Sequence, residues 1–401
     1  MKVLIIQSRS NTNLVSGEDV VINNDIEFLK KAGVQVFYKQ IKIPTSGWIS
    51  IIKNFFGLIW SPYNYKIVKS AIDIHKPDIV HFHTVVPYLS FSAIAASYIM
   101  GLPIVQTLHN GRWLCLEGGY FRNNTFCDDC VGTYGWLGVK RGCGHGKFIS
   151  FFLFLNNFIV RKFGFLFRYV SCFIAVSEFT KKQHVKSSFP EKKIIVRNNG
   201  FNTSFETDLD KSWLQREGIV YAGRVSVAKG SRVLDYLIRN LDCKISIIGN
   251  GPELNSLKQM CINNKFNHVN FFGRLNNNET LNLIKKAVVT VIPSQCGDSY
   301  PTVALESLSV GTPIVSSNLG GLPDLINSSL GGKLVDYEND RAFLKATEYF
   351  LKDKEIAKKT GNNGLKYIKE NVNSLKQSKE LIKIYNDAIN NHRLKNNDHS
   401  I

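Results

Sequence analysis

The chain has 401 residues, of which 44% are hydrophobic and 20% are charged. This length favours two domains over one core, and the composition is that of a folded protein rather than a disordered one. Lysines and arginines outnumber acids by 50 to 32, giving a net charge of +18 that favours anionic partners. We expect no nucleic-acid partner, because no double-stranded-RNA-binding, RRM or helix-turn-helix pattern is present.

The first half of the chain alternates predicted strands and helices, which is the pattern of a parallel sheet covered by helices. Strands are expected at residues 2–6, 34–38, 78–82, 103–108, 171–176 and 193–196. Because Lys2 leads directly into the first strand, with no apolar leader and cleavage site before it, we expect a cytoplasmic protein.

A polar loop, residues 8–17, connects the first strand to a helix predicted over residues 19–31. Loops at the carboxyl ends of parallel strands bind the ligands of such sheets, which makes Gly17 a candidate for contact with phosphates. A plain helix N-cap by Ser16 is the alternative.

Three histidines lie at the ends of two predicted strands. His109 follows strand 103–108, where a neutral imidazole can donate or accept a hydrogen bond without adding a charge. His81 and His83 end strand 78–82, and we interpret them as a cleft wall or as satisfied core residues rather than as catalysts.

Four cysteines gather in residues 110–146 among glycines and polar turns, namely Cys115, Cys127, Cys130 and Cys143. Their number and the central C-x2-C spacing fit a structural zinc site. Unliganded thiols in an inserted segment are the alternative. The other four cysteines are scattered, and we interpret them as core residues.

Two apolar segments raise the question of membrane contact. Residues 147–168 carry polar or small residues at helical spacing, so these line one narrow stripe while Phe and Leu cover the rest. The uninterrupted apolar part is too short to span a bilayer. Trp48–Trp60 is a second amphipathic candidate. Core helices of the first domain are the preferred interpretation of the longer segment, whereas the net positive charge suits peripheral docking on an anionic inner leaflet.

The polar residues 202–211 are the predicted hinge between two domains. Beyond it, a strand over residues 218–224 ends at Arg224, and Lys229 precedes a helix over residues 231–240. Two cations at the carboxyl end of a strand can stabilise a departing diphosphate without a divalent metal. Strand 244–249 then leads into Gly249-Asn-Gly251, which supports a nucleotide-binding half.

Residues 293–323 are the most informative stretch, and they follow the buried strand predicted at residues 287–292. A helix opens at Pro301, so the amides after Ser299 point toward an anion. Asp298 before this helix and Glu306 inside it lie eight residues apart, and both carboxylates can face one crevice. Carboxylates beside amide donors suit a ligand that carries hydroxyls and phosphates.

This stretch resembles the E-x7-E segment of retaining family 4 glycosyltransferases, with Asp298 in place of the first Glu and Glu306 as the second. The resemblance covers nearly the whole chain and implies an α/β protein of the GT-B fold, with two Rossmann-like domains facing across a cleft. We place the acceptor-binding domain at residues 1–202, including the Cys-rich insertion 110–146. The donor-binding domain follows at residues 203–378, and a C-terminal helix and tail at residues 379–401 return to the first domain.

The resemblance also implies roles for single residues. Arg224 and Lys229 would clamp the donor diphosphate. His109, in a segment like the family's Thr-Leu-His, would lie against the donor sugar. Asp298 would contact sugar hydroxyls, and Glu306 would hold the ribose. The remaining donor-binding candidates are Gly17, Gly249, Gly251, Arg274, Tyr300, Pro301 and Thr302.

The expected reaction is transfer of a hexosyl group from a nucleoside diphosphate sugar to an acceptor hydroxyl, with retention and with no cofactor required for catalysis. A lipid-linked saccharide in bacterial surface polysaccharide synthesis, of the O-antigen type, is the expected acceptor, reached from the inner face of the membrane. Two alternatives stay open: a nucleotide-sugar 2-epimerase of GT-B-like fold, and a non-catalytic membrane-binding or scaffold protein.

Overall fold

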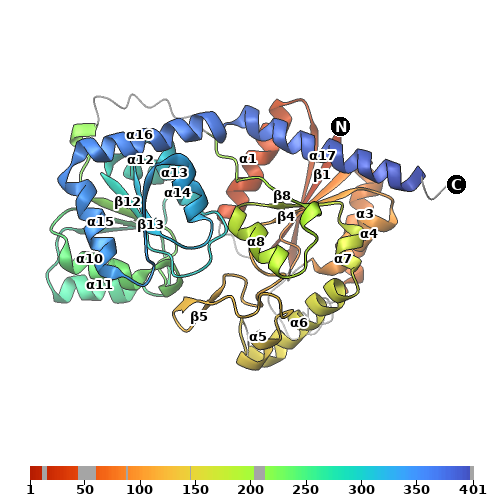
Figure 1. Cartoon of the computed structure of the whole chain (residues 1–401), viewed down its shortest axis with the longest axis horizontal. Coiled ribbons are helices and arrows are strands. Elements are labelled where there is room, and N and C mark those ends of the chain that lie inside the picture. Colours follow the sequence, from red (N-terminus) through yellow and green to blue (C-terminus); the bar gives the residue numbers. More distant parts are fainter. Residues whose placement is uncertain (11–15, 44–59, 87–88, 145, 203–212, 398–401) are drawn as a thin grey trace. The chain divides into compact units, whose positions relative to one another are not determined.

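The computed structural model describes the whole chain except residues 11–15, 44–59, 87–88, 145, 203–212 and 398–401. The chain divides into two compact units, and each contains one six-stranded parallel sheet (Figure 1). Most of the predicted apolar segment Trp48–Trp60 and of the predicted hinge 202–211 falls outside the described residues.

The first unit comprises Met1–Tyr120, Cys127–Gly200 and Leu375–Ile401. Its sheet has the strand order β2-β1-β3-β4-β7-β8, so the order reverses between β1 and β3. The strands are β1 Lys2–Ser10, β2 Gln35–Ile43, β3 Ile79–His83, β4 Ile104–Leu108, β7 Cys172–Ala175 and β8 Ile194–Val196. The helices are α1 Gly17–Lys31, α3 Pro62–His75, α4 Ser90–Ile99, α5 Trp136–Arg141, α6 Gly146–Lys162, α7 Phe165–Tyr169, α8 Glu178–Lys186, a 3-10 turn at Glu191–Lys193, and α17 Ser374–Asn397.

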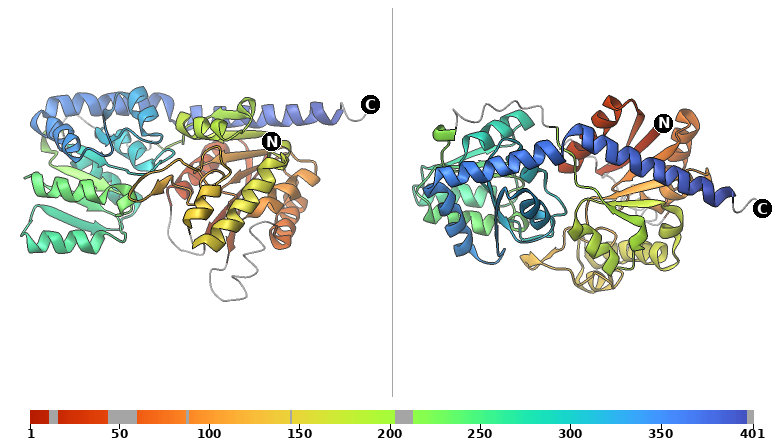
Figure 2. Two further views of the ribbon diagram at one scale, coloured as in Figure 1. Left: turned by 60° about the horizontal axis from the view of Figure 1, so that its bottom comes forward. Right: turned by 45° about the horizontal axis from the view of Figure 1, so that its top comes forward.

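Helix α17 belongs to the core of this first unit, although it lies at the other end of the chain. Leu381, Ile384, Tyr385 and Ala388 are buried at the spacing of one helix face, and they join a core cluster with residues of β1 and α1. The same helix runs along the sheet beside α1 in the views of Figures 1 and 2. Packing of an apolar stripe therefore attaches the end of the chain to the first sheet.

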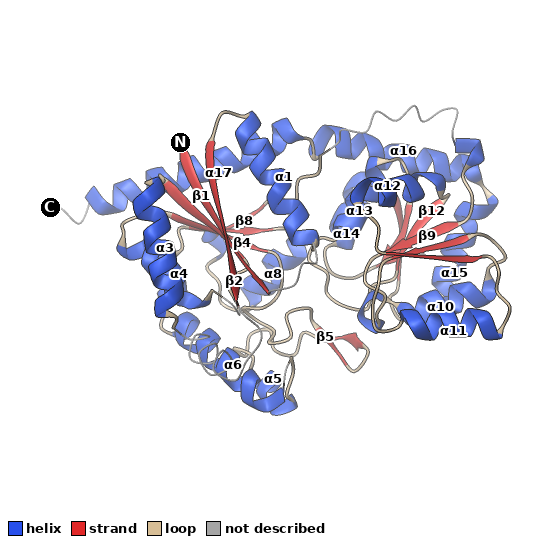
Figure 3. Ribbon diagram, turned by 180° about the vertical axis from the view of Figure 1, so that it is seen from behind, coloured by secondary structure: helices blue, strands red, loops and turns tan. Residues whose placement is uncertain are grey.

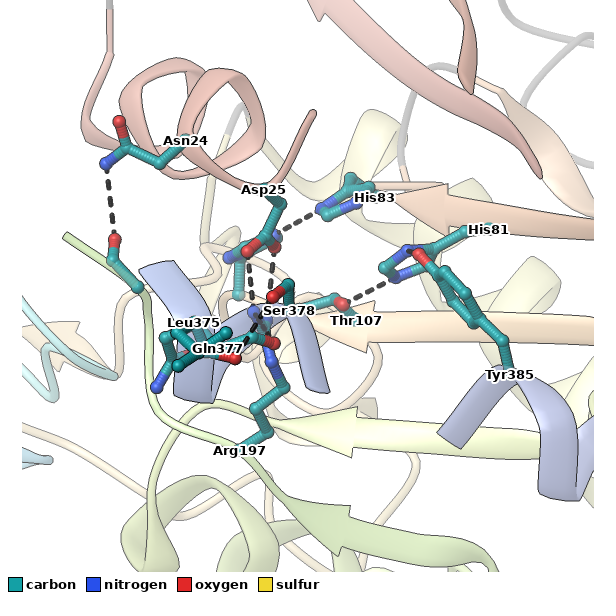
Figure 4. Close-up of polar contacts among 12 residues, drawn as sticks. Asn24, Asp25, His81, His83, Thr107, Arg197, Leu375, Gln377, Ser378 and Tyr385 are labelled. Atoms are coloured by element: carbon teal, nitrogen blue, oxygen red, sulfur yellow. Dashed lines mark hydrogen bonds and ion pairs between the residues drawn. The ribbon is translucent and has the colours of Figure 1, made fainter. Parts of the chain in front are cut away.

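A buried ion pair adds a polar connection to this packing. Arg197, which follows β8, contacts Asp25 of α1 at 2.6 Å, and both side chains are almost inaccessible. The same guanidinium donates to the carbonyl oxygen of Gln377 on α17 (Figure 4). The pair thus joins α1, the end of β8 and α17, and removing one partner would leave the other charge buried and uncompensated.

The second unit comprises Phe121–Phe126 and Phe201–Ser374. Its strand order, β11-β10-β9-β12-β13-β14, is that of a doubly wound nucleotide-binding sheet. The strands are β9 Ile219–Ala222, β10 Ile245–Ile248, β11 Val269–Gly273, β12 Val289–Ile292, β13 Ile314–Ser317 and β14 Gly332–Val335. The helices are α10 Ser231–Asn240, α11 Leu254–Asn263, α12 Asn277–Lys286, α13 Thr302–Ser309, α14 Leu322–Ser329, α15 Asp340–Lys352 and α16 Lys354–Asn371, with 3-10 turns at Trp213–Gln215 and Val227–Lys229.

Helices α10, α11 and α15 share one core cluster with the strands of this second sheet (Figure 3). A short hairpin from the Cys-rich insertion, β5 Phe121–Arg122 and β6 Thr125–Phe126, groups with the second unit, where Thr125 donates to Glu338. The observed division lies between Gly200 and Phe201, close to the expected boundary at residue 202, and it assigns six residues of the insertion to the second unit.

The predicted apolar segment 147–168 forms two helices rather than one. Gly164, with φ of 71°, separates α6 from α7, and this left-handed conformation favours glycine. None of the helices among the described residues combines the length and hydropathy needed to cross a membrane.

Candidate active site

The two predicted clamp cations and Asp298 lie at the switch point of the second sheet. Arg224 and Lys229 follow β9, and Asp298 follows β12. These two strands are neighbours at the position where the strand order reverses. Loops diverge from the carboxyl ends of strands at such a point and leave a ligand-binding crevice there.

Lys229 and Asp298 form an ion pair across this switch point. The Nζ atom of Lys229 contacts Oδ1 of Asp298, and the Ser294 hydroxyl donates to Oδ2 at 2.7 Å. Burial lowers the pKa of Lys229, but the carboxylate of Asp298 outweighs it and raises the pKa above its usual value. The ammonium is therefore positively charged and preorganised in this structure, with Asp298 as its counterion.

The loop that carries the two cations is fixed by its backbone. The hydroxyl of Tyr221 on β9 donates to the carbonyl oxygen of Arg224 at 2.8 Å and lies 3.3 Å from that of Lys229. The amide of Gln295, after β12, donates to the carbonyl of Ala228 at 2.9 Å. Arg224 itself is exposed, so its guanidinium is accessible to a ligand.

Close backbone packing explains two of the predicted glycines. At Gly249, with φ of 125°, a Cβ atom would lie 1.8 Å from the carbonyl oxygen of Gly223. At Gly251 it would lie 2.1 Å from the carbonyl oxygen of Val225. No side chain fits either distance, so both glycines let the turn after β10 support the loop that bears Arg224.

The helix predicted at Pro301 is α13, and Pro301 is its N-cap residue. Tyr300 before it is buried, whereas Pro301 and Thr302 are partly exposed, and the first amides of a helix have no partner within the helix. Arg274, the candidate after β11, is exposed at the same edge of the sheet.

Glu306 is the exceptional side chain of α13, because it is buried without a counterion. Burial alone raises its pKa to about 7, and no counterion or hydrogen bond among the described residues contributes to this shift. A buried carboxyl group without a protein partner is costly. It is the arrangement expected at a site where hydroxyl groups of a ligand supply the missing hydrogen bonds.

The first unit has its own set of polar residues at the carboxyl ends of β3 and β4 (Figure 4). Nδ1 of His83 lies 2.7 Å from Nε2 of the half-buried His109, with the rings stacked. His81 is bonded at both nitrogens, to the Tyr385 hydroxyl of α17 and to the Thr107 hydroxyl, each at 2.7 Å. His81 is therefore a satisfied core residue, whereas His83 contacts His109 directly.

The histidines of this group are neutral. Burial, opposed by Asp25, lowers the pKa of His109 to about 4, and burial also lowers the pKa values of His81 and His83. Nε2 of His83 is buried without a partner among the described residues. A buried N–H group without a hydrogen-bond partner is less tolerable than a buried acceptor without one. We therefore assign the proton of His83 to Nδ1, which then donates to Nε2 of His109. His109 consequently carries its proton on Nδ1, as a donor.

Glu18, near the start of α1, is a candidate residue that the sequence analysis missed. The Thr84 hydroxyl, after β3, donates to its carboxyl group, and burial raises the pKa of Glu18 to about 7. The preceding Ser16 caps α1 through a capping box with Asp19, as the N-cap alternative proposed. Gly17 is exposed in the first turn, and residues 11–15 of its loop lie outside the described residues.

The four cysteines of the insertion are free thiols in this structure, and two of them are buried. Burial and then the neighbouring Cys115, Cys143 and Cys127 raise the pKa of Cys130 to about 12, so the other three thiols lie near this one. Within the described part of the chain, no three His, Cys, Asp or Glu side chains are arranged to hold a metal ion. The structural zinc site at these four cysteines stays a prediction.

The raised pKa of Glu306 predicts a pH dependence of stability. The folded state keeps the proton of Glu306 up to about pH 7, whereas the unfolded state loses it near the ordinary carboxyl pKa of 4.5. Stability therefore falls as pH rises between these values, by up to about 3 kcal/mol. Urea unfolding at pH 5 and pH 7.5 should show that Glu306→Gln removes this part of the loss, while Glu217→Gln at an exposed position leaves it unchanged. An identical pH response of wild type and Glu306→Gln would contradict the assignment.

Known proteins support the same interpretation of the chain. Residues 211–367 match the model of glycosyl transferases group 1, and residues 46–205 match that of Glycosyltransferase Family 4. An uncharacterised glycosyltransferase of Methanocaldococcus jannaschii is 26% identical over 341 residues, which are 79% of this chain and 77% of the relative. The N-acetyl-alpha-D-glucosaminyl L-malate synthase of Bacillus anthracis is 24% identical over 154 residues, which are 38% of this chain and 40% of the relative.

Solved structures share the fold over nearly the whole chain. Anabaena HepE, solved in complex with UDP, has a TM-score of 0.69 at 15% identity and covers 96% of this chain and 100% of its own. Sucrose-phosphate synthase from Thermosynechococcus elongatus has a TM-score of 0.70 at 17% identity, with coverages of 96% and 98%. The two family models, which match different halves of the chain, and two Rossmann-like sheets of the GT-B type support a family 4-like glycosyltransferase.

Proposed function

We propose that the protein transfers a hexosyl group from a nucleoside diphosphate sugar to an acceptor hydroxyl, with retention at the anomeric carbon and without a metal ion in the chemical step. The observation that carries this proposal is the juxtaposition after β9 and β12: a preorganised Lys229, an exposed Arg224, and the buried, unpartnered Glu306 on α13. Cations for phosphates and a carboxylate for hydroxyls, on one edge of one sheet, are complementary to the two parts of such a donor.

The mechanism that we infer uses the donor's own leaving group as the base. As the anomeric C–O bond breaks, negative charge grows on the diphosphate, and Arg224, Lys229 and the first amides of α13 stabilise it. The acceptor hydroxyl attacks from the same face and passes its proton to the leaving phosphate. In this route no protein carboxylate forms a covalent intermediate, and Glu306 holds the ribose.

Asp298 has a second task in this scheme. Its carboxylate neutralises Lys229 before the donor arrives, and bound phosphates compete for the same ammonium. Asp298, oriented by Ser294, can then turn one oxygen to a sugar hydroxyl. The shorter side chain of Asp, compared with the Glu of the family's motif, is compatible with the ion pair that it forms.

His109 is the proposed contact to the donor sugar from the first unit. Its Nδ1–H is a hydrogen-bond donor without charge, because His83 holds its Nε2. A neutral donor can orient a sugar hydroxyl while the positive charge remains with the phosphate clamp. His83 therefore acts through His109, as a positioning residue.

For the acceptor we propose a lipid-linked saccharide used in the synthesis of a surface polysaccharide of the O-antigen type, with the enzyme in the cytoplasm and in peripheral contact with the inner face of the membrane. The net charge of +18 supports an anionic membrane as a partner. The HepE complexes with UDP, and with UDP and glucose, support a nucleotide-sugar donor by analogy of fold.

A transfer assay with product analysis tests the reaction. Radiolabelled nucleotide sugars are incubated with membrane extract as acceptor source and with EDTA, and Lys229→Ala is compared with Lys286→Ala, an exposed control. We expect Lys229→Ala to lower kcat by roughly 10²- to 10³-fold. The double variant Lys229→Ala/Asp298→Ala removes the orphaned carboxylate, and we expect no recovery of activity. Recovery in the double variant, or conversion of the donor to its C2 epimer without acceptor, would contradict the proposal.

A second pair of variants tests the His83–His109 contact. His83→Phe removes the donor to His109, whereas His83→Asn keeps an N–H near the position of Nδ1. We expect roughly tenfold or greater loss of kcat in the Phe variant, partial retention in the Asn variant, and little change of the donor KM in either, because the contact orients the sugar rather than the nucleotide. Equal losses in both variants would assign His83 a purely structural role.

A further inference from the structure

The polar side of helix α6 faces the protein, and its aromatic side faces outward. Ser150, Asn157 and Arg161 are buried, and each donates to a backbone carbonyl of another segment: Ser150 to Cys143, Asn157 to Arg112, and Arg161 to Trp113 and Ser187. The polar stripe expected from the sequence is thus the inner face of the helix. The preferred interpretation of this segment as a core helix is confirmed for the inner side, where Leu153 and Val160 are also buried, but not for the opposite side.

The opposite side of α6 carries large apolar side chains at the spacing of one helix face. These are Phe148, Phe151, Phe152, Leu155 and Ile159, and Phe163 and Phe165 continue the apolar surface at the turn into α7. Phe148 is 69% exposed, Phe163 66%, and Phe151 and Phe165 40% each. Helix α5, which packs beside α6 in Figure 1, adds Trp136 at 44%. We call this surface the aromatic face.

Basic residues predominate around the aromatic face, and the acidic Asp129 is paired with Arg141 of α5. No Asp or Glu occurs between Asp129 and Glu178, a stretch that contains all of α5, α6 and α7. Five basic side chains in this stretch are exposed, namely Lys140, Arg141, Lys147, Lys162 and Arg168. Lys162 lies on the same side of α6 as the aromatic face, and Lys147 begins the helix. Exposed aromatic groups bordered by lysines, on helices that contain no acid, match the headgroup region of an anionic bilayer.

We infer that the aromatic face of α5, α6 and α7 is a docking surface for an anionic lipid bilayer, in which α6 lies parallel to the membrane plane. The helix is too short and too polar on one side to cross the bilayer, but its outer side can insert to headgroup depth while the inner side keeps its hydrogen bonds. A second copy of the chain is the weaker occupant, because it would bring the same positive charge to the contact. The inference deepens the proposed function by locating the membrane contact of the enzyme. It rests on the proposed function only for the reason why the protein would bind a membrane.

Co-sedimentation with vesicles tests the surface without any enzymatic readout. Vesicles of phosphatidylcholine alone are compared with vesicles that contain about 30% phosphatidylglycerol, and we expect binding to the second kind that weakens as salt increases. Phe148→Ser/Phe151→Ser should weaken binding by at least about tenfold, because the variant lacks two aromatic rings that would transfer from water into the bilayer. Ile262→Ser, at a position that is also 69% exposed but in the second unit, is the matched control and should bind like wild type.

A charge variant separates this surface from the general positive charge. Lys147→Glu/Lys162→Glu should weaken binding to the anionic vesicles several-fold more than Lys366→Glu/Lys369→Glu, which makes the same change of net charge on exposed positions of α16. Equal effects of the two charge variants, or binding unchanged by Phe148→Ser/Phe151→Ser, would overturn the proposal. A change from dimer to monomer in the Phe variant, seen by light scattering without lipid, would assign the face to self-association instead. Because nucleotide binding is measured separately, loss of vesicle binding and failure of the transferase proposal are distinguishable.

Discussion

Parallel pairing of every strand in the two six-stranded sheets is the constraint on which the site depends. Parallel strands end at one edge, so the loops that follow them come together although they are far apart in sequence. The order of strands reverses once in each sheet, between β9 and β12 in the second and between β1 and β3 in the first. The clamp cations Arg224 and Lys229 lie at the reversal point of the second sheet. Glu18 and His83 lie next to the reversal point of the first sheet. Topology thus explains why chemistry gathers at these places in both units.

The charged groups differ between the reversal points of the two sheets. In the second unit a cation is held ready by a carboxylate, and a further carboxyl group is buried without a partner. In the first unit the histidines are neutral, and the charges of Arg197 and Asp25 cancel each other within the core. A transferase that must stabilise a departing diphosphate needs positive charge near the phosphates and polar but uncharged groups near the sugar. The described residues provide both kinds of environment.

Much of this arrangement could be predicted from the sequence, because apolar runs and glycine turns are local signals. Most strands of the two sheets and the helix after Pro301 follow from such patterns, whereas the return of the C-terminal helix was implied by the family resemblance. Strand β14, Gly332–Val335, was missed because its sequence lacks a β-branched run. Pair contacts could not be predicted. The bond between His83 and His109, the pair of Arg197 with Asp25, and the contact of Glu18 with Thr84 join residues distant in sequence. The outward direction of the Phe residues on α6 could not be predicted either, because it depends on the hydrogen bonds of Asn157 and Arg161 to backbone carbonyls of a distant segment.

The central claim is that the loops after β9 and β12 bind the nucleoside diphosphate part of a donor sugar. Thermal unfolding with a panel of nucleoside diphosphates and nucleotide sugars, without added metal, tests it most directly, since a ligand that binds the folded state raises the melting temperature by mass action. The account predicts a selective shift for one base that disappears in Lys229→Ala and persists in Lys286→Ala. No shift with any nucleotide from well-folded protein, or a shift that Lys229→Ala retains in full, would contradict it.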